Sequence, residues 1–348
     1  MTHRIAVIPG DGIGTEVIAE AVRVLERVGG VELHHLPWSA EHYLATGQTI
    51  PPDGYDTLRS FDAVLVGALG DPRVPDNRHA RDILLGTRFE LDLYVNQRPV
   101  RLLDERLCPL KDRTPEEVNF VVFRENTEGL YVGIGGRFKP GTDEEVAVQE
   151  EINTFKGVNR IVRHAFAFAR SRGLRRVCMA DKSNAMTHGH ALWQRVFQEV
   201  SKEYADVEAT HLYIDALSMF LVQDPGRFDV IVTNNLFGDI ITDIGGALQG
   251  GLGMAASGNI HPGRTSMFEP VHGSAPPLAG KNVANPIGAI LSTALMLETL
   301  GARDESKAIE RAVEAAVKET QTTPDIGGTL GTREVGAWIA RRIQKTAG

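Results

Sequence analysis

The sequence predicts an α/β protein built around a largely parallel sheet, and two observations support this fold class. Short apolar runs of strand length alternate with longer segments in which apolar residues recur at helical spacing. The chain has 348 residues, of which 42% are hydrophobic, and this is enough for about two domains with sizeable cores. No linker, repeat or low-complexity tract separates two such domains, so we expect the chain to cross between them more than once.

The first βα unit illustrates the pattern. The run RIAVIPG predicts a strand, and the segment GTEVIAEAVRVLERVGG that follows predicts a helix, because apolar residues recur in it every three or four positions. Later apolar runs predict the strands AVLVGA (63–68), FVVFRE (120–125), RVCMAD (176–181), THLYID (210–215) and DVIVTNN (229–235). Further helices are predicted over GVNRIVRHAFAFARSRG (157–173), ALWQRVFQEVSKEY (191–204) and AIERAVEAAVKET (308–320).

The composition excludes several classes of protein. With 45 acidic residues against 37 Lys and Arg, the net charge of -8 argues against a nucleic-acid or membrane surface. The longest apolar stretches are too short to span a bilayer and the N-terminus lacks a signal-peptide pattern, so we expect a cytoplasmic protein. Cys108 and Cys178 have no disulfide or zinc spacing and are predicted to be thiols packed in the protein.

Two carboxylates stand four residues apart in the apolar run FGDIITDIGG. On a helix, Asp239 and Asp243 would share one face and repel each other by a few tenths of a kcal/mol. Solvent and the helix dipole can offset this repulsion, and so can a divalent cation, which takes oxygen ligands. The residues alone leave both explanations open.

Three arginines form a candidate anion site. Arg88 and Arg98 flank the strand-like LYVN, and Arg124 ends the predicted strand FVVFRE. The planar guanidinium matches a carboxylate, so three converging arginines would suit a di- or tricarboxylate. Scattered surface ion pairs are the alternative.

Two glycine-bearing turns invite a nucleotide interpretation. PGDGIGTE does not match the dinucleotide fingerprint, because Thr15 stands where the third glycine is needed. In the loop EPVHGSAPPLAGKNVANP (269–286), small residues would let backbone N–H groups approach phosphates, and His272 and Asn285 would be able to bond an adenine edge. An ordinary surface turn is the alternative for this loop.

Taken together, these segments resemble the β-decarboxylating dehydrogenase family, which includes 3-isopropylmalate, isocitrate, homoisocitrate and D-malate or tartrate dehydrogenases. The resemblance extends from residue 8 to residue 328 and depends on the order of several motifs. They are IPGDGIG, LDLYVNQRP, FRENTEGLY, DKSN, YID, NLFGDIITD, FEPVHGSAP, ANP and TPDIGG.

The resemblance implies a fold with two α/β domains that differs from the standard Rossmann fold. Residues 1–101 and 250–348 are expected to form a discontinuous cofactor-binding domain, and residues 102–249 a smaller central domain. The central domain is expected to dimerise and to carry part of the metal site. The active cleft would lie between the domains of a homodimer whose active sites are shared between subunits.

The resemblance also assigns roles in catalysis. Asp215 from one subunit and Asp239 with Asp243 from the other would hold the metal, and an all-oxygen set suits Mg²⁺ or Mn²⁺. Lys182, aided by Asp215 or a water, would remove the proton of the substrate 2-hydroxyl, and Tyr131 would supply the proton that completes the product. Arg88, Arg98 and Arg124 fall on the positions that bind substrate carboxylates.

The cofactor implied by the resemblance is NAD. NAD-using members commonly place an acidic residue where this chain has Pro277, and NADP-using members place a phosphate clamp at positions that are Pro277, Leu278, Pro324 and Gly328 here. No such clamp is present in the sequence, so NAD remains favoured. The cofactor contacts are expected from Asn184, Glu269, His272, Gly273, Ser274, Ala275, Leu278, Asn285 and Asp325.

The substrate is expected to carry an apolar 3-substituent. Leu84 and Leu85 stand where isopropylmalate enzymes present apolar side chains, so we expect oxidative decarboxylation of 3-isopropylmalate to 2-oxo-4-methylpentanoate and CO₂, a step of leucine biosynthesis. Ala185 is smaller than the usual valine and Arg81 replaces a frequent glutamate, so a D-malate or tartrate dehydrogenase is the alternative.

A non-catalytic regulatory subunit of the same family is an alternative of another class. Such a subunit would have no chemical need for the complete set Tyr131, Lys182, Asp215, Asp239 and Asp243.

Overall fold

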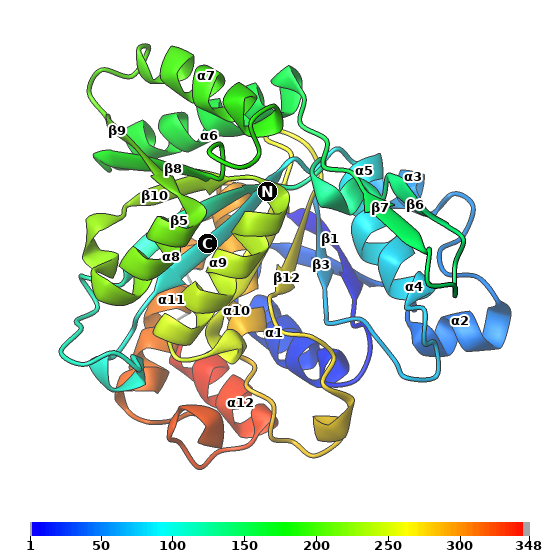
Figure 1. Cartoon of the computed structure of the whole chain (residues 1–348). Helices are drawn as coiled ribbons and strands as arrows, with labels where there is room; N and C mark the ends of the chain where they lie inside the picture. Colours follow the sequence, from blue (N-terminus) through cyan, green and yellow to red (C-terminus); the bar gives the residue numbers. More distant parts are fainter. Residues whose placement is uncertain (1, 344–348) are drawn as a thin grey trace. The chain divides into compact units, whose positions relative to one another are not determined.

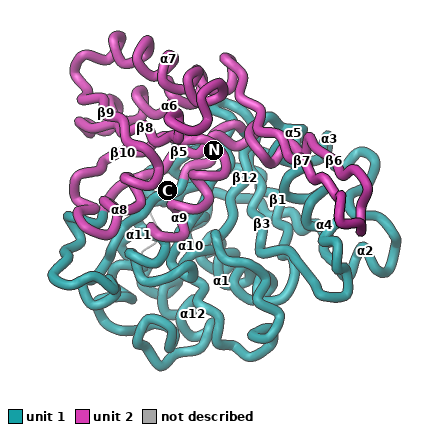
Figure 2. Tube along the Cα trace, in the orientation of Figure 1, with its two compact units in different colours: residues 1–93, 98–118, 246–348 teal, residues 94–97, 119–245 magenta. Residues whose placement is uncertain are grey.

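The structure is a computed structural model that describes residues 2–343 (Figure 1). The chain forms two compact units, coloured separately in Figure 2. The terminal unit comprises residues 2–93, 98–118 and 246–343, and the central unit comprises residues 94–97 and 119–245. The chain therefore passes from one unit to the other several times.

The terminal unit is built on a mostly parallel sheet. Its strand order is β2-β1-β3-β12-β11, and only the β11–β12 pair is antiparallel. These strands span β1 (His3–Ile8), β2 (Val31–His35), β3 (Ala63–Val66), β11 (Ala256–Ile260) and β12 (Ser266–Pro270). The side chains of β3 are all buried, which is why this strand reads as an uninterrupted apolar run.

Four longer helices pack in the terminal unit. Helix α1 contacts α10, α11 and α12, and α10 also packs on β11 and β12. Their bounds are α1 (Gly14–Val28), α10 (Ile287–Thr299), α11 (Arg303–Lys318) and α12 (Thr332–Arg342). Shorter helices are α2 (Ala40–Thr46), α3 (Gly54–Arg59), α4 (Arg78–Ala80) and α5 (Thr87–Glu90), with a π-helical turn η1 (Arg81–Gly86) joining the last two. Single 3₁₀ turns are η2 (Glu105–Leu107), η5 (Leu252–Met254), η6 (Pro276–Leu278) and η7 (Pro324–Ile326).

The central unit contains a parallel sheet in the order β5-β10-β8-β9. The strands are β5 (Asn119–Glu125), β8 (Arg176–Asp181), β9 (Glu208–Tyr213) and β10 (Val230–Thr233). The helices are α6 (Phe155–Arg172), α7 (Gly189–Ser201), α8 (Ile214–Gln223) and α9 (Asn235–Leu248), with 3₁₀ turns η3 (Leu130–Val132) and η4 (Pro225–Arg227). An antiparallel ribbon consists of β6 (Gly135–Phe138) and β7 (Val146–Gln149).

Helix α6 shows how the sequence fixes the ends of an element. The side chain of Thr154 accepts a hydrogen bond from the backbone N–H of Gly157 and so caps the first turn. Gly173 ends the helix with φ of 67°, a left-handed conformation that glycine adopts without strain. The helix predicted over 157–173 is therefore present and begins two residues earlier.

Strand β4 (Val95–Arg101) belongs to both units, with residues 95–97 in the central unit and 98–101 in the terminal unit. Residues 102–118, which the sequence analysis placed in the central domain, group with the terminal unit. The reason is visible in their contacts, because Arg106 donates hydrogen bonds to the carbonyls of Ile326 and Val317.

The strand predicted over 210–215 ends earlier than expected. Strand β9 ends at Tyr213, and Asp215 lies in the first turn of α8. A carboxylate in the first turn of a helix is favoured by the helix dipole, and the sequence pattern alone did not reveal this boundary. No helix among residues 2–343 is long and apolar enough to cross a bilayer.

Candidate active site

Arg124 lies at the carboxyl end of β5 and anchors the first cluster of candidate residues. The residue is 1% exposed, and its Nε donates to Asn235 Oδ1 at 2.9 Å. Its Nη1 pairs with Asp239 Oδ1 at 2.5 Å. Gly238 permits this approach, because a Cβ there would lie 2.6 Å from Arg124 Cβ. The glycine in NLFGDIITD therefore makes room for the arginine.

Tyr131 joins the same cluster. Its hydroxyl donates to Asp239 Oδ2 at 2.9 Å, and the Arg124 guanidinium lies 5.1 Å from the centre of its ring. Asp239 thus receives a charged donor on one oxygen and a phenol on the other. The structure brings together three of the residues predicted for substrate binding, proton transfer and metal binding.

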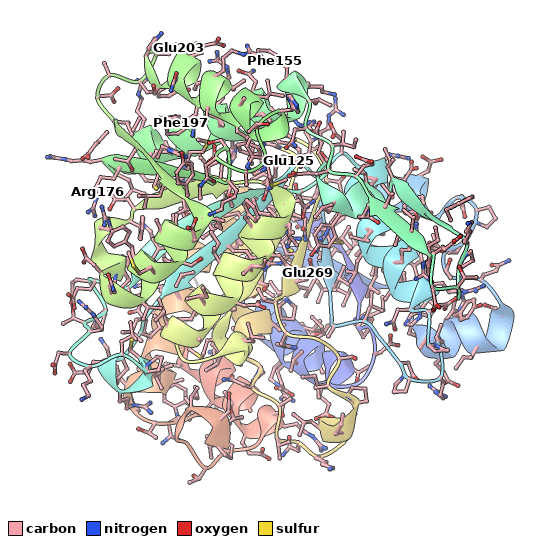
Figure 3. All side chains as sticks on the ribbon, viewed as in Figure 1. Glu125, Phe155, Arg176, Phe197, Glu203 and Glu269 are labelled. Carbon is pink, nitrogen blue, oxygen red and sulfur yellow. The ribbon has the colours of Figure 1, made fainter. Side chains whose placement is uncertain are left out.

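Glu125, next to Arg124, was not singled out in the sequence. The residue is 1% exposed, and its side chain is labelled in Figure 3. It accepts hydrogen bonds from the Thr127 N–H and hydroxyl and from the Glu128 N–H, and Arg160 Nη2 lies 3.9 Å away. Burial raises the pKa of Glu125 to about 7, although these hydrogen bonds oppose the rise. The only signal in the sequence was an acidic residue closing an apolar strand beside a candidate arginine.

Lys182 and Asp215 form a second cluster. Lys182 Nζ donates to Asp215 Oδ1 at 2.5 Å, and this bond holds the pKa of Asp215 below its usual range. The pair arises because β8 and β9 are parallel neighbours, with Asp181 opposite Tyr213, so the residues that follow each strand come together. The backbone N–H of Lys182 donates to His190 Nδ1 at 2.7 Å, which ties this turn to α7.

The candidate metal ligands occupy two places in the chain. Asp239 and Asp243 lie four residues apart on α9, where they share a face, and Asp215 starts α8. Within residues 2–343, no three His, Cys, Asp or Glu side chains are grouped closely enough to hold a metal ion. The structure of one chain therefore places two of the three predicted ligands side by side, and sharing of the site with a second copy stays a prediction.

In the terminal unit, Arg88 is held by Glu269. Arg88 Nη2 donates to Glu269 Oε1 at 2.9 Å, and the same oxygen accepts from Asn259 Nδ2 at 2.8 Å. All three residues are buried, and Glu269 is labelled in Figure 3. Arg88 Nε is buried and has no hydrogen-bond partner among the described residues. Arg98, the third candidate arginine, lies on β4 and is 7% exposed.

The predicted substrate-pocket leucines lie in the π-helical turn η1. Leu84 and Leu85 are both half-buried, and Leu84 packs against a core that includes Trp38 and Leu58. Single π-helical turns occur frequently at functional sites. Arg81, which begins the turn, is exposed.

The cofactor loop contains His272, which has one ring nitrogen unpaired within residues 2–343. Nε2 of His272 is buried and has no hydrogen-bond partner in the described part of the chain, and burial lowers the pKa of the ring. Around Gly273, a Cβ would meet no atom within 4 Å. A neutral imidazole beside an open glycine fits a nucleotide base, which offers hydrogen-bonding groups of its own.

The remaining predicted cofactor residues differ in their surroundings. Asn285 Nδ2 donates to Asp325 Oδ2 at 3.0 Å, so these two are already bonded to each other. Ser274 offers its carbonyl to the Ile13 N–H, and Ala275 adopts φ of 37°. Leu278 is 42% exposed in the terminal unit, and Asn184 is exposed in the central unit.

Comparison with known proteins identifies the class. The family described as isocitrate/isopropylmalate dehydrogenase matches residues 4–339. The chain is 37% identical to the crystal structure of isocitrate dehydrogenase from Methylococcus capsulatus, with a TM-score of 0.90 over 99% of this chain and 100% of that one. The chain belongs to the isocitrate/isopropylmalate dehydrogenase family. The predicted family, fold and class of enzyme, a dehydrogenase, are confirmed.

Two relatives in the same family carry the name 3-isopropylmalate dehydrogenase. The 3-isopropylmalate dehydrogenase of Thermobifida fusca is 47% identical over 98% of this chain and 98% of its own length. That of Rhodococcus erythropolis is 48% identical over 98% of this chain and 100% of its own length.

Proposed function

We propose that this protein catalyses the NAD- and Mg²⁺- or Mn²⁺-dependent oxidative decarboxylation of 3-isopropylmalate to 2-oxo-4-methylpentanoate and CO₂, as a step of leucine biosynthesis. The observation that carries the proposal is the cluster in which Arg124 and Tyr131 share Asp239, with the bonded pair Lys182–Asp215 in the same unit. Relatives named 3-isopropylmalate dehydrogenase, which span nearly the whole chain, support the choice of substrate.

The arginines bind the two carboxylates of the substrate. Arg88 enters this role with its guanidinium already oriented by Glu269 and with Nε still without a hydrogen-bond partner among the described residues. Arg124 is fixed on both sides, by Asn235 and by Asp239, so little side-chain freedom is lost when a carboxylate binds. The planar fork of each arginine fixes the direction of the carboxylate as well as its charge.

Lys182 removes the proton of the 2-hydroxyl. Asp215 accepts a hydrogen bond from Lys182 Nζ and so orients the amine toward the substrate 2-hydroxyl. Tyr131 then donates a proton to the carbon from which CO₂ has left. Its hydroxyl is hydrogen-bonded to Asp239, and this bond holds the phenol in one rotamer.

The chemistry of the candidate ligands suits a divalent cation and NAD. Asp239 and Asp243, with Asp215 of a second copy, offer only oxygen ligands, which suits Mg²⁺ or Mn²⁺. The unpaired Nε2 of His272 is the candidate hydrogen-bond partner for the adenine of NAD. When bound, the cation stabilises negative charge on the substrate oxygens and NAD accepts the hydride.

A homodimer is part of the proposal, because Asp215 must reach the carboxylates of α9 from another chain. Exposed apolar side chains in the central unit support it. They lie on and beside the β6–β7 ribbon and on helices α8 and α9, and include Ile134, Phe138, Val146, Val148, Met219, Val222 and Ile240, which are 46–64% exposed. Exposed apolar surface marks an interface when it is contiguous, so these elements are the candidate contacts of the homodimer.

A D-malate or tartrate dehydrogenase is the second candidate. Ala185 is small and exposed, which leaves room that a bulkier side chain would fill. Arg81 at the start of η1 is exposed and charged, and would tolerate a polar substituent on the substrate.

One substrate panel tests the proposal. The purified protein, with NAD and Mg²⁺, is assayed for NADH formation on 3-isopropylmalate, D-malate, tartrate, isocitrate and homoisocitrate. We expect 3-isopropylmalate to exceed D-malate by roughly 10- to 200-fold in kcat/KM, the gain that an apolar substituent provides in a matching pocket. Equal rates on D-malate or tartrate would favour the second candidate. Turnover of no substrate would favour a regulatory subunit.

A further inference from the structure

The turn PGDGIG, between β1 and α1, has no role in the proposed mechanism, yet it contains a buried acid. Asp11 is 6% exposed. Its Oδ1 accepts from the Ala40 N–H at 2.8 Å, and its Oδ2 accepts from the Gly70 N–H at 2.9 Å. The same Oδ2 lies 2.8 Å from Nε2 of His79, whose side chain is fully buried. Since a carboxylate only accepts, the imidazole N–H is the donor in this bond.

His79 stands at the start of the segment that carries the substrate residues. It belongs to α4, which continues without a break into η1 and then α5. This segment contains Leu84, Leu85 and Arg88. A displacement of His79 would therefore be passed along the helical turns to the residues that meet the substrate.

The other side of the same turn holds the cofactor loop. The Ile13 N–H donates to the Ser274 carbonyl at 2.9 Å. Gly12 has φ of 56°, and a Cβ there would lie 2.1 Å from the Ser274 carbonyl oxygen. Glu16, in the first turn of α1, accepts a hydrogen bond from the Gly280 N–H. The glycines of this turn therefore allow its backbone to pack closely against another segment of backbone.

We infer that Asp11 is a positioning residue that, through His79, fixes the substrate-binding segment 79–88 relative to the cofactor loop 273–280. The inference rests on the proposed function for the roles of these two segments. It explains why a turn that fails the phosphate-binding fingerprint is rich in glycine and contains a buried acid. The contact of this turn with the nucleotide loop is made through Ser274, and its contact with the substrate segment is made through His79.

Two variants of His79 separate positioning from packing. His79→Leu fills most of the space but removes the donor, so Asp11 Oδ2 loses one of its two hydrogen bonds. His79→Gln keeps a side-chain N–H that is able to reach the carboxylate. Glu20→Gln is the matched control, because Glu20 is also a buried acid of the terminal unit but bonds to Arg23, on its own helix.

We expect His79→Leu to raise the KM for 3-isopropylmalate roughly tenfold and to accelerate amide hydrogen exchange over residues 79–88 by a similar factor, with a smaller effect on kcat. His79→Gln should recover most of both changes, and Glu20→Gln should leave both at the wild-type level. A His79→Leu protein that melts at a lower temperature while its KM and its exchange over 79–88 stay unchanged would show a purely structural role and overturn the inference.

If His79→Leu does not fold, Asp11→Asn replaces it, because one amide oxygen cannot accept every bond that the two carboxylate oxygens accept, and unchanged KM and exchange in that variant would overturn the inference. If the wild-type protein turns over no substrate of the panel, the proposed function fails. The exchange measurement still tests the positioning of the segment, since it needs no turnover.

Discussion

Glu125 should make the stability of this protein depend on pH in a way that one substitution abolishes. Its pKa is about 7 in the folded protein, because the side chain is buried, against 4.5 for the ordinary carboxyl. The folded state therefore binds this proton more tightly than the unfolded state does. The stabilisation from this proton is complete below pH 4.5 and is lost as the pH rises through 7.

The size of the effect follows from the two pKa values. At about 1.4 kcal/mol for each unit of pKa, a rise from 4.5 to about 7 corresponds to about 3 kcal/mol when fully developed. Most of this develops between pH 5 and pH 8, so the free energy of unfolding should fall by about 2 to 3 kcal/mol over that range from this group alone. Glu125→Gln cannot ionise and should lack this contribution.

Urea denaturation of wild type and Glu125→Gln at pH 5 and pH 8 provides the measurement. The difference between the two proteins in free energy of unfolding should shift by about 2 to 3 kcal/mol in favour of the variant as the pH is raised. Glu150→Gln, which changes an exposed glutamate of the same unit, serves as control and should show no such shift. A pH-independent difference between wild type and Glu125→Gln would refute the reasoning, because it would mean that Glu125 ionises normally in the folded protein.

Three further predictions concern the proposed reaction. Tyr131→Phe removes the proton donor and its bond to Asp239, so kcat should fall by about 10²- to 10⁴-fold with little change in KM; an unchanged kcat in steady-state assays would argue that another group supplies the proton. Mg²⁺ should raise the melting temperature of wild type but not of Asp239→Asn, and equal midpoints with metal and with chelator would contradict the metal assignment. Pro277→Asp should increase the ratio of kcat/KM for NAD to that for NADP, and a constant ratio would locate cofactor selection outside this loop.

The sequence predicted those parts of the molecule that follow from local pattern. Strand β5 and strand β8 appear where apolar runs lie in the sequence, because strands buried on both faces need apolar side chains throughout. The Lys182–Asp215 pair forms because both residues follow parallel neighbouring strands, which makes their proximity a consequence of topology.

Other features could not be predicted, because they depend on contacts between distant segments. Asp11 and His79 are 68 residues apart, and nothing near either one indicates the other. The role of Glu269 as the partner of Arg88 depends on a contact across 181 residues. The pKa of Glu125 depends on burial, which a strand pattern indicates only for apolar residues.

The order of segments in the terminal unit has a consequence for synthesis on the ribosome. Strand β3 pairs with β12, so the edge of β3 stays uncovered until Ser266 has been made, about 200 residues after Val66. At about 5 to 20 residues per second, this leaves an open strand edge for roughly 10 to 40 s. Residues 119–245 are continuous and have their own parallel sheet, so they are able to fold first. Nascent chains arrested before residue 266 should therefore lose residues 2–93 to protease while the central unit resists digestion.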